Sequence, residues 1–345
     1  MNQFPMSSFT VGLAIIGGIL LAVLVAWNTW STRRNTPRQP LAPATPADPQ
    51  EPAERSDPVF DAPLAPIPAL EKKPGLDALI DVIAPITLES EISGDHALAA
   101  MPPTRRVGSK PFAIEGFHDA TGHWETPQAG RRYSAFQAGV QLANRTGALN
   151  EIEYSEFVMK VQGFADAIGG SPEFPEMRDE VARARELDQF ASAHDAQLGF
   201  TLRARNAAWS PGYVHQHAAR LGFVPGAIPG RMVLPGSNAG APAVLGLSCD
   251  AQAAMADDPA QSAIRTLTLS VDVPQVDRSE QPFVRMRDAA ITLAASMDGL
   301  ISDDNGQVIR AEALDGIGAD LEHLYDTLDA RDLAAGSAQA RRLFS

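Results

Sequence analysis

The histidines, the cysteine and the paired aspartates are the residues of this chain whose chemistry would be easiest to recognise from spacing. The seven histidines have no acidic or cysteine neighbours at the spacing of metal ligands, so we expect solvated or half-buried side chains. His215 and His217 lie two positions apart in a predicted helix, so they project to different sides and cannot chelate one ion together. The run DDNG at 303–306 resembles part of a calcium loop, but the later glutamate is missing and a turn explains it.

Motifs of nucleotide binding and nucleophilic catalysis are also missing from the sequence. There is no Gly-rich phosphate loop, no GxSxG elbow and no kinase-type set, and GAIPG at 226–230 is typical of a Pro/Gly turn. Acid–base pairs can come from distant positions, so an enzyme stays open as the less favoured alternative. We expect a non-enzymatic protein with no cofactor and no metal site.

The elements that must position any binding residues begin with an apolar run at 9–30, FTVGLAIIGGILLAVLVAWNTW. At about 1.5 Å per residue, a helix of this length crosses a hydrocarbon core roughly 30 Å thick. No charged residue precedes the run, whereas Arg33, Arg34 and Arg38 follow it, which biases that side toward the cytoplasm. A cleaved signal peptide would need a basic start, a shorter core and a cleavage site, so a single membrane-spanning anchor is favoured.

Composition limits the class of partner. The net charge of −14 and the pI near 4.9 count against nucleic acid and favour basic partners. Cys249 is the only cysteine, so no internal disulfide is possible, and we expect it to be a small buried apolar residue. Together with the charges that flank the anchor, the lack of a disulfide fits a single-pass membrane protein with its N-terminus outside and its remaining chain in the cytosol.

Residues 31–75 are rich in proline and alanine and cannot bury a core. We predict a disordered linker there, extended enough to serve as a tether between the membrane and the rest of the chain. A PxxP ligand for an adaptor domain is the functional alternative.

From residue 76 the chain repeats one order of predicted elements. The pass at 76–190 has strands at 80–88, 111–114 and 139–144, and helices after 93, near 156–170 and near 175–195. The pass at 194–330 has strands at 197–203, 231–234, 244–249 and 266–273, and helices near 210–222, 285–299 and 311–330. We predict an α+β fold of antiparallel sheets with helices on one face, in two tandem modules and a tail at 331–345. Two unrelated patterns of similar order are the alternative.

The predicted helices near 156–170 and 285–299 each carry an apolar stripe at the 3-4 spacing of an amphipathic helix. The stripes are Phe157, Val161, Phe164 and Ile168 in the first helix and Met286, Ala290, Leu293 and Met297 in the second. We expect the two helices to end at Gly169 and Gly299, as C-caps.

Strand alternation assigns the two faces of the second module. Leu267, Leu269 and Val271 point one way and Thr268 and Ser270 the other, and the remaining strands alternate similarly. The apolar set belongs under the helices, so a polar face of small residues is expected to be uncovered.

Four segments of the second module carry a resemblance to a known family. They are AQLGFTLRARNAAWSPGYVHQHAARLGF, PAVLGLSC, TLTLSVDVP and MRDAAITLAASMDGLISDDNG. Together with the anchor and the tether, this ordered series resembles the ZipA family of bacterial cell-division proteins. The resemblance implies a module at 194–330 that binds the C-terminal tail of FtsZ, while the N-terminal helix contacts membrane lipid.

The resemblance also implies where the tail would bind, on the uncovered sheet face. The corresponding residues here are Gln197, Gly199, Ile228, Met232, Val244, Ser248, Asp250, Gln252, Thr268 and Ser270. Most are polar or small, and only Ile228, Met232 and Val244 are apolar. We therefore expect either weaker FtsZ binding aided by the acidic surface or a site in the first module.

The leading functional interpretation is a membrane-anchored adaptor that binds FtsZ and tethers the division filament to the inner membrane during septum assembly. A general envelope scaffold that binds another basic peptide is the first alternative. A membrane-tethered enzyme is the second.

Overall fold

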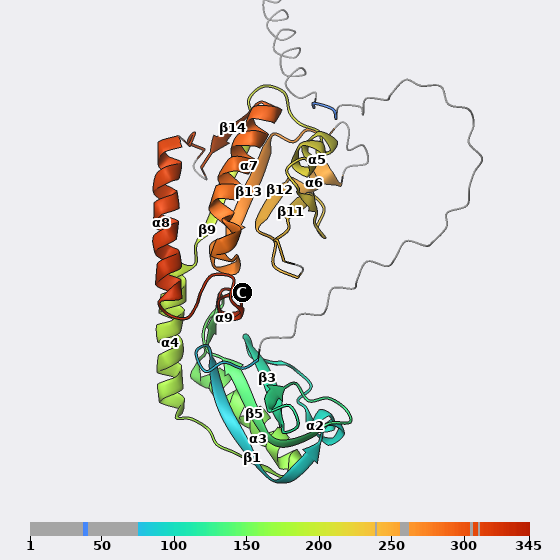
Figure 1. The fold of residues 1–345 in the computed structure, drawn as a ribbon, viewed down its shortest axis with the longest axis vertical. Coiled ribbons are helices and arrows are strands. Elements are labelled where there is room, and N and C mark those ends of the chain that lie inside the picture. Colours follow the sequence, from blue (N-terminus) through green and yellow to red (C-terminus); the bar gives the residue numbers. More distant parts are fainter. Residues whose placement is uncertain (1–36, 41–74, 239, 256–261, 304–305, 310) are drawn as a thin grey trace, which may run out of the picture. The chain divides into compact units, whose positions relative to one another are not determined.

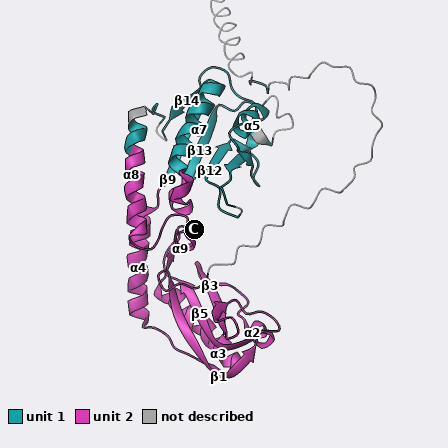
Figure 2. Ribbon diagram, viewed as in Figure 1, with its two compact units in different colours: residues 1–67, 198–271, 282–316 teal, residues 68–197, 272–281, 317–345 magenta. Residues whose placement is uncertain are grey.

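The computed structural model describes residues 37–40 and 75–345, apart from 239, 256–261, 304–305 and 310 (Figure 1). The predicted anchor at 9–30 and most of the predicted linker at 31–75 lie outside the described residues. Within the described part, no helix is both long and apolar enough to cross a membrane. The chain forms two compact units (Figure 2). Among the described residues, unit 1 contains 37–40, 198–271 and 282–316, and unit 2 contains 75–197, 272–281 and 317–345.

Both units are α+β with antiparallel sheets, as predicted. The predicted boundary near 190–194 lies close to the division after Gln197. Residues 272–281 and 317–330, predicted in the second module, cluster instead with unit 2.

Unit 2 is built on a sheet with the order β2-β3-β5-β1-β8, and β4 pairs with β3 at one side. Its strands are β1 (Asp81–Ser93), β2 (Arg106–Val107), β3 (Lys110–His118), β4 (His123–Glu125), β5 (Arg132–Gln141) and β8 (Gly170–Pro172), with a separate pair β6 (Ala143–Asn144) and β7 (Gly147–Ala148). Its helices are α2 (Gly94–Ala100), α3 (Glu151–Ile168), α4 (Met177–His194) and α9 (Ala338–Leu343).

Helix α3 covers one face of the unit 2 sheet. Its predicted stripe, Phe157, Val161, Phe164 and Ile168, is buried. The rings of Phe157 and Phe164 make edge-on contacts with Phe112 on β3 and Phe136 on β5. Capping residues set both ends of this helix.

The N-terminus of α3 is closed by a capping box between Asn150 and Glu153. Gly169 ends the helix at φ 69°, a left-handed conformation that glycine adopts without strain.

Unit 1 contains a sheet with the order β10-β11-β12-β13-β9-β14. Its elements are β9 (Gln197–Ala204), α5 (Pro211–Ala219), β10 (Val224–Pro225), β11 (Arg231–Leu234), β12 (Leu245–Cys249), α6 (Ala251–Ala254), β13 (Thr266–Asp272), α7 (Pro282–Met297) and β14 (Gly299–Ser302). Helix α8 (Ala311–Asp329) follows, and its residues from 317 on cluster with unit 2.

The apolar stripe predicted for α7 is buried as expected, with Met286, Leu293 and Met297 fully enclosed. The predicted glycine cap at the end of this helix is wrong. Asp298 takes the left-handed position at φ 55°, and Gly299 is the first residue of β14. Aspartate is among the few non-glycine residues that adopt this conformation. The Asp298 carboxylate accepts hydrogen bonds from Arg38 and Asn206.

Candidate functional site

The polar sheet face predicted for the second module exists in unit 1. Ser248 on β12 pairs with Thr268 on β13, and Gly246 pairs with Ser270, so these residues share one face. Thr268 and Ser270 are exposed, whereas Leu267 and Leu269 between them are buried. On β9, Gln197 is exposed and Gly199 is half-buried. The alternation therefore separates the faces as the sequence indicated, and this face offers hydroxyls and backbone rather than apolar area.

Two of the predicted contact residues do not contribute to that face. Met232 on β11 pairs with Leu247, which pairs in turn with Leu269, so Met232 belongs to the apolar face beneath the helices. Its exposed fraction is 8%, and that of Val244 is 1%. The prediction that these two side chains are available on the uncovered face is wrong. The nonlocal register of β11 decides the side of Met232, and Val244 is enclosed where its amide donates to the Leu234 carbonyl at 2.8 Å.

An apolar pocket of about 330 Å³ lies instead between α5 and the β10–β12 end of the sheet. Pro211, Gly212 and Val214 contribute from α5, and Leu247 and Leu267 contribute from the apolar sheet face. Of the predicted contact residues, Ile228, Met232 and Ser248 line this pocket. Val214, Leu247 and Leu267 were not predicted as contacts. No pattern within α5 or β12 signals these contacts, because the pocket forms only where the two elements come together.

Ile228 is the exposed apolar side chain at this pocket, with an exposed fraction of 53%. The turn predicted at 226–230 holds it there. The amide of Gly226 donates to the Arg231 carbonyl at 2.9 Å, and the amide of Arg231 donates to the Ile228 carbonyl at 3.1 Å. Gly230 has φ 76°, which favours glycine. The short β10–β11 hairpin thus presents an isoleucine that nothing in the described part of the chain covers fully.

Polar chemistry at the pocket is limited. Cys249 lines it and is half-buried rather than fully buried as predicted, and burial raises the pKa of its thiol. A raised pKa leaves less thiolate at neutral pH, so this thiol is a poor nucleophile. Asp250 is exposed, and its carboxylate caps the short helix α6 by accepting from the Gln252 amide at 2.9 Å. The pocket is suited to an apolar side chain.

His217 differs from the prediction of a solvated or half-buried histidine, because its exposed fraction is 6%. Its Nδ1 lies 3.1 Å from the Ser296 hydroxyl, which itself donates to the Leu293 carbonyl. The Nε2 atom is buried without a hydrogen-bond partner in the described structure. Burial is the largest cause that lowers the pKa of this imidazole, so it is held neutral. His215 is exposed and lies at the pocket, so the two side chains diverge as predicted.

Unit 2 has a larger cavity, of about 760 Å³, on the sheet face opposite α3. This face is partly covered by the chain itself. A Cβ on Gly139 would lie 2.5 Å from the Leu76 side chain, so Leu76 packs directly on the strand. From α9, the Arg342 carbonyl accepts from Gln141 Nε2 at 2.8 Å. The prediction of a separate tail at 331–345 is therefore wrong, because Leu343 and Phe344 are buried in unit 2.

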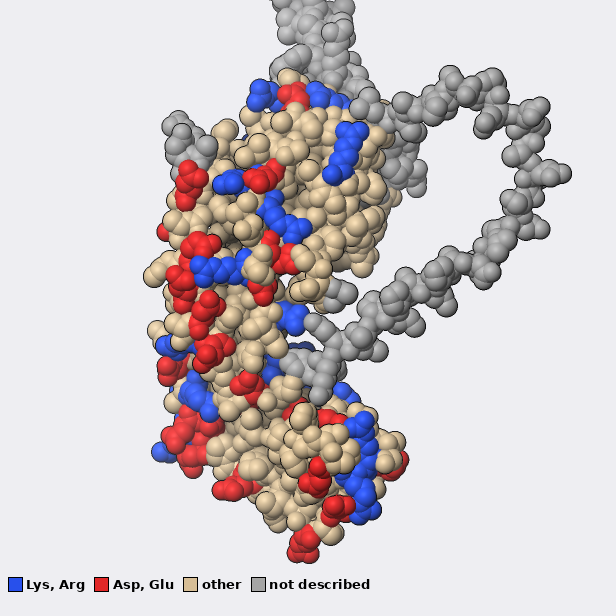
Figure 3. All heavy atoms as spheres, in the orientation of Figure 1, with Lys and Arg blue, Asp and Glu red and all other residues tan. Residues whose placement is uncertain are grey.

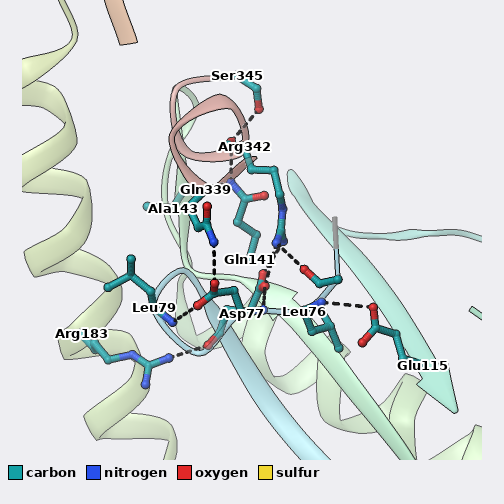
Figure 4. A network of polar contacts seen from close by, with 12 residues as sticks. Leu76, Asp77, Leu79, Glu115, Gln141, Ala143, Arg183, Gln339, Arg342 and Ser345 are labelled. Atoms are coloured by element: carbon teal, nitrogen blue, oxygen red, sulfur yellow. Dashed lines mark hydrogen bonds and ion pairs between the residues drawn. The ribbon is translucent and has the colours of Figure 1, made fainter. Parts of the chain in front are cut away.

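A polar network holds α9 in place (Figure 4). Arg342 binds Asp81 with both ends of its guanidinium, at 2.5 and 2.9 Å. The Asp77 amide donates to the same carboxylate at 2.8 Å, and Gln339 donates to Asp77. Leu76 donates its amide to Glu115 at 3.1 Å. The side chain of Asp81 is fully buried, so Arg342 supplies its compensating charge.

No cluster of three or more histidine, cysteine, aspartate or glutamate side chains in the described ranges could hold a metal ion. Comparison with known proteins gives no assignment: no protein-family model matches the chain. No curated protein matches it either.

Proposed function

We propose that this protein is a non-enzymatic adaptor that is anchored in the bacterial inner membrane and binds the C-terminal tail of FtsZ through unit 1. The observation that carries the proposal is the apolar pocket of about 330 Å³ with the half-exposed Ile228 at its edge. The identity of the tail comes from the resemblance to the ZipA family. Because the pocket lies beside the β10–β11 hairpin, we place the contact with the tail there rather than on the polar sheet face.

The pocket has the size and chemistry to take one or two apolar side chains of a peptide. Full burial of one large aliphatic side chain contributes about 1.5–3 kcal/mol. Part of that gain is offset by the cost of ordering the peptide, so a single contact of this kind is weak. A filament presents many tails at once, and binding by several anchored copies gains from the raised effective concentration. A weak pocket on a membrane-bound adaptor therefore suits a polymeric partner.

The charge of the chain favours the same kind of partner. The net charge of −14 attracts a basic peptide to the chain as a whole rather than to the pocket itself, whose lining includes Arg231. The family resemblance implies that the FtsZ tail carries basic residues. Such long-range attraction raises mainly the association rate and falls with added salt.

We further propose that the two units are tandem copies of one module. In unit 1 the first strand, β9, lies between β13 and the last strand, β14. In unit 2 the first strand, β1, lies between β5 and the last strand, β8. Each unit also has a helix after its first strand and another before its last. This shared order supports duplication, while coverage of the unit 2 face by Leu76 and α9 leaves unit 1 as the binding copy.

The test is binding of an FtsZ tail peptide to the full chain reconstituted in nanodiscs, followed by fluorescence anisotropy. Ile228→Ala should weaken binding about fivefold, because roughly half of an isoleucine side chain, worth about 1 kcal/mol, remains to be buried. The matched control is Ile291→Ala on α7, with a similar exposed fraction of 49% and no place in the pocket. Equal affinities for the two variants, or no binding at millimolar peptide, would remove the proposal.

A scaffold that binds another basic peptide stays as the second candidate, because the pocket lining has few polar groups that could distinguish one peptide from another. Capture from total cytosol by the full chain separates the two. Enrichment of FtsZ that is lost in Ile228→Ala supports the division adaptor, and enrichment of a different basic protein supports the scaffold.

A further inference from the structure

Residues 37–40, which follow the apolar run closely in sequence, dock on unit 1. The Arg38 amide donates to the Ala208 carbonyl at 2.7 Å, and the Ser210 amide donates to the Arg38 carbonyl at 3.1 Å. These bonds form an isolated parallel bridge between Arg38 and Trp209. The prediction of a featureless linker over 31–75 is therefore wrong at these four positions.

Side chains strengthen this docking. The Arg38 guanidinium lies 2.9 Å from the Asp298 carboxylate and donates to the Met297 carbonyl at 3.4 Å, so it binds the C-terminal end of α7. Pro40 lies against Gly212, where an added Cβ would be 3.2 Å from the proline ring. Main-chain, charged and apolar contacts thus all hold the segment at one end of unit 1.

The covalent chain then limits how far that end can be from the apolar run. Only residues 31–36 separate Trp30 from Pro37. Seven Cα-to-Cα steps span at most about 25 Å even when fully extended. If 9–30 spans the membrane as proposed, the docked end of unit 1 lies within that distance of the lipid headgroups. The long proline-rich stretch comes after the docked segment and leads to unit 2.

The end of unit 1 near Arg38 is basic, although the chain as a whole is acidic. Figure 3 shows blue side chains grouped at the upper end of this unit. Arg203 and Arg205 are exposed on and after β9, and Arg220 is exposed at the end of α5. Arg205 lies 3.9 Å from the same Asp298 that binds Arg38. The described charged groups of this end are Arg38, Arg203, Arg205, Arg220 and Arg265, with Asp298 and Asp303.

We propose that this arginine-rich end of unit 1 is a membrane-facing surface that binds anionic phospholipid headgroups. The inference rests on the proposed membrane anchor. Juxtamembrane arginines are attracted to anionic lipid, and the attraction acts within about one Debye length, roughly 8 Å at physiological salt. The anchor keeps the surface within reach, and the docked residues 37–40 fix which side of unit 1 faces the bilayer.

The test measures how close unit 1 lies to the bilayer in the full chain reconstituted into vesicles. A donor fluorophore is attached at Met255→Cys, an exposed position of unit 1, in a Cys249→Ser background so that only one thiol is present. Acceptor-labelled lipid reports proximity. Vesicles are made of phosphatidylcholine with or without phosphatidylglycerol.

Three arginines are replaced together, Arg203→Gln, Arg205→Gln and Arg220→Gln, which leaves the Arg38 docking untouched. The matched control makes the same charge change on exposed arginines of unit 2, Arg105→Gln, Arg178→Gln and Arg185→Gln. We expect energy transfer to rise about twofold when phosphatidylglycerol is added, for the parent and the control, and to stay at the phosphatidylcholine level for the triple variant. High salt should remove the rise.

Three other outcomes would overturn the inference, and they show whether the headgroup contact or the anchor has failed. If the chain stays inserted but energy transfer is equal in the two kinds of vesicle, the headgroup contact is refuted and the anchor is not. The same holds if the two triple variants respond alike. Release of the chain from vesicles by alkaline carbonate would remove the anchor, and the headgroup contact with it.

Discussion

Removing the Arg342 side chain should open unit 2 locally, because it would leave a buried carboxylate without its counter-charge. The Asp81 side chain has no exposed surface, and the Arg342 side chain keeps 20% of its own. Breaking a buried ion pair by deleting one partner costs about 3–5 kcal/mol. We expect about 3 kcal/mol for Arg342→Ala, because the Asp77 amide still donates to the carboxylate.

The loss should depend on pH with a definite sign. Burial is the largest influence on Asp81 and raises its pKa above 3.8, while the hydrogen bonds from Arg342 act in the opposite direction. A carboxyl with a raised folded-state pKa contributes stability below its unfolded pKa and loses it as pH rises through the folded value. Deleting Arg342 raises that pKa further. The difference between parent and variant should therefore be small near pH 4 and largest near pH 7.

Hydrogen–deuterium exchange of the full chain, read by mass spectrometry, reports the two units separately. Peptides from β1 and β5 should exchange about 100-fold faster in Arg342→Ala at pH 7, while peptides from β13 serve as an internal reference. The control variant is Arg132→Ala, whose pair with Glu91 is exposed at 66% and 48% and contributes little. If the two variants exchange alike, or if the Arg342→Ala effect is the same at both pH values, the reasoning about the buried pair is refuted.

Three further predictions concern packing, titration and reactivity. Gly116→Ala should cost about 1–3 kcal/mol in thermal unfolding, because its Cβ would lie 2.5 Å from the buried Tyr133 ring. Gly163→Ala, in an open position on α3, should instead gain up to about 1 kcal/mol, and shifts of the same sign would contradict the packing argument. The lowered pKa of the buried His217 means that stability should fall as pH drops below about 6.5, the unfolded value, until the folded pKa is passed. Denaturant unfolding at pH 7.5 and 5.5 checks this, and a His217→Gln variant with the same pH slope would count against it. Cys249, whose thiol pKa is raised by burial, should alkylate more slowly at neutral pH than a free peptide thiol, as followed by intact mass, and equal rates would show that the pocket is open to solvent.

Local patterns in the sequence were sufficient to predict much of the fold. The 3-4 recurrence of Phe157, Val161 and Phe164 placed α3 on its sheet, and Gly169 marked its end. Alternation along β13 separated Ser270 from Leu269. These features depend on residues a few positions apart, so helix and strand periods reveal them directly.

The candidate site was predicted only in part. Ile228 was identified as the exposed apolar residue, and the structure keeps it exposed. Met232 was assigned to the wrong side, because its side depends on pairing with Leu247, which follows it by fifteen positions. The pocket needs α5 and β12 to come together, and no pattern within either segment indicates the space between them.

By itself, then, the sequence determined the α+β class, the helix stripes, the strand faces and the acidic character of the chain, since each follows from local spacing or from composition. Only the tertiary structure decided that Arg38 docks on unit 1 and that Arg342 closes over Asp81. Those contacts join residues about 260 positions apart. They form because a buried or half-buried charge must find its counter-charge wherever the fold brings one within reach.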